Sequence, residues 1–257
     1  HGGMDHGGMD HGGMDHGGMD HGGMDMAPDG IPLAQGGEDR DGLEMDELHL
    51  QAGPVLANWP AGLAVTWTLQ GDVIVAAKGR WEPSTATHAG PPTYGVGLTP
   101  QAAWRCDNLA ALLRLAGWWD GAAHATRLRD LILDAGAVDH AAQAELVQLA
   151  QRVFRSRVLR WSLRGLGPLE ADDLGRRGLP AAWAGDSGAR LSVMLHTIES
   201  SAGGSEPKPA DAEPPLPDGQ AIADLTTGLD VAAARLVVAS LNLPPVGVHR
   251  HHELAGA

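Results

Sequence analysis

The sequence contains one cysteine, Cys106, in 257 residues. A single cysteine excludes an internal disulfide and any cluster held by several cysteines, such as four-cysteine zinc or iron–sulfur sites. No apolar run approaches the roughly 18 residues of a membrane-spanning helix. The N-terminal residues do not pair a basic segment with an apolar one, so no signal peptide is expected. These absences predict a cytoplasmic protein without a transmembrane segment.

Positive charge is scarce as well, because 18 Lys and Arg stand against 32 Asp and Glu for a net charge of −14. An acidic surface repels phosphate backbones, so nucleic acid is not expected as a partner. Common catalytic motifs are also missing. The sequence has no G-x-G-x-x-G, no P-loop, no H-E-x-x-H and no G-x-S-x-G, so no reaction can be assigned from motifs.

The most distinctive feature that is present is a repeat, because residues 1–25 are five copies of His-Gly-Gly-Met-Asp. Its glycine content makes ordering costly, so we expect residues 1–47, the repeat and its lead-in, to be disordered. Imidazole and thioether groups suit copper, and histidines on a mobile chain also suit nickel or zinc. The candidate metal ligands are His1, Met4, Asp5, His6, Met9, Asp10, His11, Met14, Asp15, His16, Met19, Asp20, His21, Met24 and Asp25. The alternative is a solubilising tail that arose by repeat expansion.

Other residues with possible chemistry have plainer interpretations. His249, His251 and His252 could form a second metal patch, but we favour a charged terminal tail. Cys106 lies near the start of an apolar helix, where a buried structural thiol fits better than a nucleophile. The eight tryptophans are explained by core and interface packing.

Periodicity predicts an α+β fold in which an N-terminal β-hairpin packs on a mainly α-helical bundle. Order is expected from about Leu48, and alternation on both sides of Gln70-Gly71 predicts a hairpin over about 63–77. Capped apolar stripes predict four helices. The first runs from Thr99-Pro100 to Gly117, and the second follows a cap at Asp120. The third covers about 140–164 after a cap at Asp139, and the fourth follows a cap at Asp186.

The remaining boundaries follow from composition. Residues 48–200 are predicted to form the core, and the Pro-rich residues 201–219 a linker. Residues 220–257 are predicted to hold a C-terminal element and a His-containing tail. Helix and strand both remain open for residues 220–242.

Four segments carry a resemblance to a known family. The first segment begins at Gly53-Pro54, continues through a predicted strand and ends at Gly71-Asp72-Val73-Ile74. The other three are Leu163–Leu174, Gly185–Ile198 and Ile222–Asp230. In this order they resemble the 49 kDa protein family of respiratory complex I, the NADH-quinone oxidoreductase. That family is related to the large subunit of nickel–iron hydrogenases. The resemblance implies a shortened relative that covers most of residues 53–230.

The departures from the family decide the implied function. The family carries histidines beside the quinone in the loop after its Gly-Pro, whereas Gly53–Gly62 holds none and has Pro60 or Ala61 at the histidine position. The H-R-G-x-E segment and the hydrogenase's paired C-x-x-C ligands are absent. The resemblance therefore implies a scaffold without the parent chemistry.

Three functional hypotheses follow. The leading one is a non-catalytic protein, similar to that complex I family, with a structural or assembly role, whose protein partner belongs to a membrane-bound quinone oxidoreductase or hydrogenase. Membrane association is then expected only through that partner. The second is a binding module for copper, nickel or zinc that uses the repeat. The third is a cryptic enzyme that acts on quinone or another redox ligand.

Overall fold

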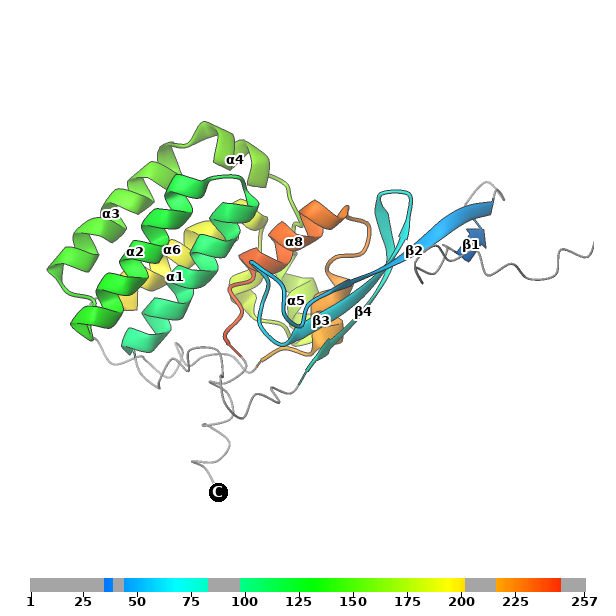
Figure 1. The fold of residues 1–257 in the computed structure, drawn as a ribbon, viewed down its shortest axis with the longest axis horizontal. Helices are drawn as coiled ribbons and strands as arrows, with labels where there is room; N and C mark the ends of the chain where they lie inside the picture. Colours follow the sequence, from blue (N-terminus) through cyan, green and yellow to red (C-terminus); the bar gives the residue numbers. More distant parts are fainter. Residues whose placement is uncertain (1–34, 39–43, 83–97, 202–215, 246–257) are drawn as a thin grey trace, which may run out of the picture. The chain divides into compact units, whose positions relative to one another are not determined.

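The computed structural model describes residues 35–38, 44–82, 98–201 and 216–245 (Figure 1). The described residues between 35 and 82 form a four-stranded antiparallel sheet with the strand order β1-β2-β3-β4. The strands are β1 (Gln35–Glu38), β2 (Glu44–Ala52), β3 (Leu63–Gln70) and β4 (Val73–Trp81).

The predicted β-hairpin is confirmed as β3 and β4. Its register runs from Leu63 opposite Trp81 to Gln70 opposite Val73. Gly71 makes the turn at φ 61°, a backbone conformation that favours glycine. The hairpin is part of a larger sheet, because β2 pairs with the other edge of β3 and begins before Leu48, the predicted start of order.

Helices make up the rest of the described chain, so the α+β class is confirmed. The helices are α1 (Leu98–Leu115), α2 (Trp119–Ala135), α3 (His140–Arg155), α4 (Arg157–Leu163), α5 (Ala171–Arg177), the 3-10 helix η2 (Ala181–Trp183), α6 (Ser187–Ser201), α7 (Gly219–Asp224) and α8 (Val231–Ser240). None of these described helices has both the length and the apolar character of a membrane span.

Two of the predicted helix caps are confirmed. Asp139 accepts a hydrogen bond of 2.8 Å from the amide of Ala142 at the start of α3. Asp186 accepts one of 2.8 Å from the amide of Ala189 at the start of α6. Each carboxylate satisfies an amide that has no partner within its helix.

Three predicted helix boundaries are wrong. The helix predicted over 140–164 is two helices, because Ser156 is extended (φ −70°, ψ 105°) and its hydroxyl caps Leu159 in α4. Asp120 lies in the first turn of α2 and is not its cap. The first helix begins at Leu98, so Thr99 lies inside it. Apolar spacing continues through these positions, and it cannot by itself locate a break.

Residues 220–242 are helical rather than a strand, since they form α7 and α8. Asp230 caps α8 by accepting from the amide of Ala233 at 2.7 Å. Residues 202–215 of the predicted linker lie outside the described residues.

The described chain buries two apolar clusters. One lies among α1, α2, α3, α4 and α6, and the other lies between the sheet and the segments that contain α5, η2, α7 and α8. Trp67 of β3 donates from Nε1 to Oγ1 of Thr226 at 2.9 Å, which ties the sheet to the α7–α8 connection. The sheet therefore packs mainly on the C-terminal helices, and α8 in turn contacts α1 and α6 of the bundle (Figure 1).

Candidate functional site

The metal ligands predicted in the repeat, His1 to Asp25, lie outside the described residues, as do His249, His251 and His252. Metal binding by either segment therefore stays a prediction. Within the described ranges, no group of three or more His, Cys, Asp and Glu side chains is arranged to hold a metal ion.

Arg190 of α6 is buried, with 1% of its surface exposed. Its guanidinium makes five hydrogen bonds, to the carbonyl oxygens of Gly185 (2.7 Å), Gly167 (3.0 Å) and Trp183 (3.2 Å) and to the hydroxyls of Ser240 (2.7 Å) and Ser187 (3.0 Å). Burial lowers the pKa of Arg190 to about 10, against the opposing effect of the Asp186 carboxylate. Because a guanidinium has five N–H donors, none remains for a ligand.

Asp186 makes a second connection between the same segments. Besides capping α6, it accepts a hydrogen bond of 2.8 Å at Oδ2 from the amide of Gly165. That bond lowers the pKa of Asp186 most, and the backbone bonds from Ala189 and Gly188 lower it further. Partial burial acts in the opposite direction, but the pKa still lies below its usual value. The Leu163–Leu174 and Gly185–Ile198 segments, which carry the resemblance, are thus bonded to each other through Asp186 and Arg190.

The Gly53–Gly62 loop is held closely against the sheet. Trp59 donates from Nε1 to the carbonyl of Leu63 at 2.8 Å, and the amide of Gly62 donates to the carbonyl of Pro54 at 3.1 Å. A Cβ on Gly53 would lie 2.0 Å from the carbonyl oxygen of Leu63, and Gly53 has a φ of 76°. Only glycine fits this position, for steric and conformational reasons together.

A cavity of about 280 Å³ lies between this loop, α1 and the chain after α8. Pro60 and Ala61, the positions at which the resemblance expects a histidine, line it. Three of its polar side chains are engaged within the protein. Asp107 accepts from Arg129 at 2.6 Å, Asn108 donates to the carbonyl of Leu243 at 2.8 Å, and Arg114 donates to Thr126 at 2.9 Å.

Cys106 is fully buried in α1, which confirms the prediction of a buried thiol. Burial raises its pKa to about 12, and the neighbouring Asp107 carboxylate adds to this effect. Because the thiolate is the reactive form, the thiol is chemically quiet at neutral pH.

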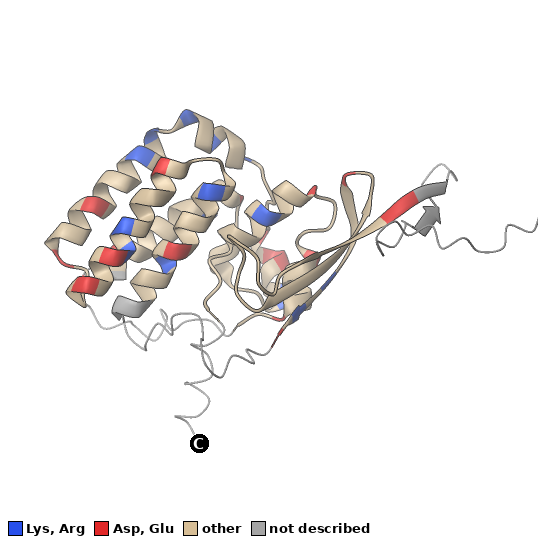
Figure 2. Ribbon diagram, in the orientation of Figure 1, with Lys and Arg blue, Asp and Glu red and all other residues tan. Residues whose placement is uncertain are grey.

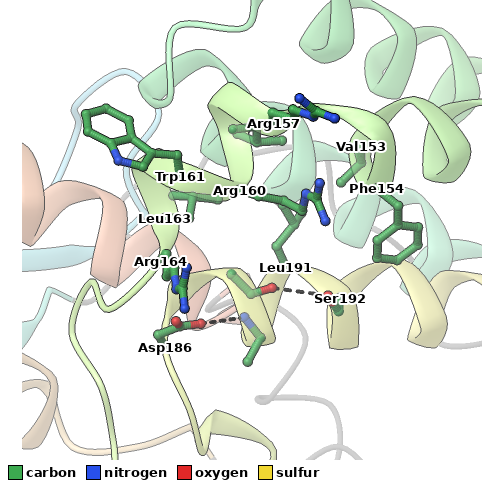
Figure 3. A pocket seen from close by; sticks show the side chains of 13 residues that line it. Val153, Phe154, Arg157, Arg160, Trp161, Leu163, Arg164, Asp186, Leu191 and Ser192 are labelled. Atoms are coloured by element: carbon green, nitrogen blue, oxygen red, sulfur yellow. Dashed lines mark hydrogen bonds between the residues drawn. The ribbon is translucent and has the colours of Figure 1, made fainter.

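A second cavity, of about 530 Å³, lies beside α4. Arg157, Arg160 and Arg164 line it together with Phe154, Asp186 and residues of α6. Trp161 lines the cavity as well, but it points away from α6, whereas Arg160 and Arg164 point from α4 and its C-terminal end towards α6 (Figure 3). We call this region the α3–α4 corner and define it by Phe154, Arg157, Val158, Arg160, Trp161 and Arg164.

The predictions from sequence missed the α3–α4 corner, although a signal was available. The chain from residue 146 to residue 169 contains five arginines and no Asp or Glu, in a protein with a net charge of −14. The interpretation of residues 140–164 as one apolar-striped helix took account of its buried side and not of its exposed one.

Comparison with known proteins gives no assignment, since the chain matches no protein-family model and no curated protein.

Proposed function

We propose that this chain is a non-catalytic protein, similar to the complex I family named above, that associates with a membrane-bound quinone oxidoreductase or hydrogenase in a structural or assembly role. The observation that carries the proposal is the hydrogen-bonded cluster around Arg190. Family-like residues that are far apart in the sequence, Gly167 and Arg190, meet through a hydrogen bond of 3.0 Å. A retained scaffold predicts this relationship, whereas chance likeness of short motifs does not require it.

The lack of chemistry at the expected quinone position supports the same proposal. Pro60 and Ala61 line the cavity there, and neither side chain can donate a proton. The neighbouring Asp107 is held by Arg129 through a bond of 2.6 Å. A general acid must lie within hydrogen-bonding reach of the oxygen that it protonates, and Asp107 is already committed to an arginine.

The experiment is affinity purification of the full chain from its own cells after mild crosslinking, followed by identification of the proteins that copurify. We expect the chain to copurify in stoichiometric amounts with the subunits of a quinone oxidoreductase or hydrogenase. The chain should also migrate with that enzyme's activity on a native gel. Elution of the chain alone, or with partners that lack redox centres, would contradict the proposal. A second pull-down with an unrelated acidic protein of similar size is the matched control.

A second candidate function is metal binding by the repeat, which is favoured by the five copies of His-Gly-Gly-Met-Asp. Thioether ligands select Cu(I), whereas imidazole also suits nickel and zinc. Changing the five repeat methionines to leucine should therefore weaken Cu(I) binding and leave Zn(II) binding in place. Equal binding of Cu(I) by both proteins would argue against a role for the thioethers, and no binding of any of these metals would exclude this candidate.

A further inference from the structure

We propose that the α3–α4 corner is a docking surface for an anionic lipid membrane. The corner combines three arginines with apolar side chains on the outside of a bundle whose inner face is already buried. The inference does not depend on the proposed partner complex. It replaces the expectation that the chain reaches a membrane only through other proteins.

The first argument is local charge. Arg157, Arg160 and Arg164 line one cavity, and Arg155 is exposed beside them. Basic positions follow the end of α3 and α4 in Figure 2, with one acidic position close to the end of α3, and positions of both signs occur elsewhere on the bundle. Asp186, also at the cavity, offsets one of these charges. Because salt screens exposed charges beyond about 10 Å, the remainder of this acidic chain does not cancel the attraction of the corner to anionic headgroups.

The second argument is the exposure of large apolar side chains. Trp161 is 79% exposed, Val158 76% and Phe154 48%. α4 buries Leu159 and Leu163 on its inner side and leaves Val158 and Trp161 on its outer side, whereas Phe154 lies in the last turn of α3. Tryptophan favours the boundary between headgroups and acyl chains, and arginine beside it reaches the phosphates. Apolar and basic residues on one exposed helix are typical of interfacial membrane binding.

Two features favour a membrane over an acidic protein partner. The stretch from residue 146 to residue 169 carries cations alone, without the alternating acids that fix register against another protein. Val158 is 76% and Trp161 79% exposed on α4. A soft lipid surface accommodates such protruding side chains without a preformed pocket, whereas a protein partner must supply one.

The experiment is co-sedimentation of the full chain at neutral pH with vesicles of phosphatidylcholine, with and without about a third of phosphatidylglycerol. The expected result is binding to the anionic vesicles alone, lost at high salt. R157Q/R160Q should reduce the partition coefficient roughly twenty-five-fold, since each basic residue contributes about five-fold. W161A should reduce it several-fold.

Matched variants control for general stickiness. R176Q/R177Q removes two exposed arginines from α5, and V55A removes an apolar side chain that is 97% exposed in the Gly53–Gly62 loop. Both should bind like the unchanged chain, and all variants should keep its thermal midpoint because these residues lie at the surface. Equal losses in the control variants, equal binding to neutral vesicles, or no binding to either vesicle would overturn the proposal. Binding to soluble poly-glutamate but not to vesicles would overturn it in favour of an acidic protein partner.

Discussion

Arg190 of α6 donates from Nε to the hydroxyl of Ser240 in α8 at 2.7 Å. The same guanidinium reaches the carbonyl of Gly167, so one buried side chain joins the bundle, the loop after α4 and the C-terminal helix. A buried cation is costly unless its donors are satisfied. All five donors of Arg190 are satisfied here, so we expect this junction to depend on Arg190.

Replacement of Arg190 by Met should therefore destabilise the fold strongly. The change keeps apolar volume but leaves the carbonyls of Gly167, Trp183 and Gly185 without their side-chain donor. We expect the free energy of unfolding to fall by about 3 kcal/mol or more, measured by urea unfolding. Ser240→Ala, which removes one acceptor of the buried guanidinium, should cost less, about 2 kcal/mol. A loss of unfolding free energy for Arg190→Met that is smaller than the loss for Ser240→Ala would show that the junction does not depend on the arginine.

Asp186 should make stability depend on pH. Its folded-state pKa lies below the ordinary value of 3.8, so the folded state binds the proton less readily than the unfolded state. The stabilisation is complete above that ordinary value and is lost as pH falls through the folded-state pKa. Asp186→Asn retains a capping oxygen but cannot titrate. The stability difference between the two proteins should therefore shrink from pH 6 towards pH 2.5 in urea unfolding, and a constant difference would contradict the assignment.

Much of the local structure could be predicted from the sequence because its signals are local. Gly71 marks the hairpin turn, and Asp139 and Asp186 cap helices within three residues of themselves. Ser156 was missed because its capping bond competes with a continuing apolar stripe, and the stripe alone does not show which prevails.

Long-range relations could not be predicted in the same way. Two of the five bonds of Arg190 reach Gly167 and Ser240, 23 and 50 positions away, and no spacing rule links them. The α3–α4 corner is an intermediate case. Its run of arginines is visible in the sequence, but the outward direction of Trp161 follows only once Leu159 and Leu163 are known to face inwards.

Gly79 of β4 and Gly219 of α7 provide a test of the sheet–helix contact. A Cβ on Gly79 would lie 2.1 Å from the carbonyl oxygen of Gly219, so Gly79→Ala must push α7 off the sheet. We expect a loss of about 2 kcal/mol in unfolding free energy. Gly175→Ala in α5 is the matched control, since nothing lies within 4 Å of its Cβ, and a helical alanine should stabilise by up to about 1 kcal/mol. Similar effects of the two changes would refute the close approach.

Deletion of residues 1–25 should leave the thermal midpoint nearly unchanged in the absence of metal. The expectation rests on the sequence, because the repeat offers no large apolar side chain except methionine. The measurement is a thermal scan of both proteins with a chelator present. A loss of several degrees, which corresponds to about 1 kcal/mol in a domain of this size, would mean that the repeat packs on the folded part.

The final prediction is that the purified chain turns over neither quinone nor hydrogen, whatever metal is supplied. Hydrogenase chemistry of the related family needs a thiolate-bound metal, and the one cysteine here, Cys106, is fully buried with its pKa raised to about 12. Quinone reduction needs a proton donor near the carbonyl oxygen, and Pro60 and Ala61 line the cavity where the family's histidine would stand. The assays are reduction of a soluble quinone by a chemical reductant and hydrogen-dependent dye reduction, each against boiled protein.

Pro60→His and Ala61→His should be equally inactive, because Asp107 is already paired with Arg129 and one imidazole does not rebuild an active site. Turnover that follows the protein through purification would instead make the chain an enzyme, and a gain of activity in either histidine variant would show that this cavity can act on a quinone.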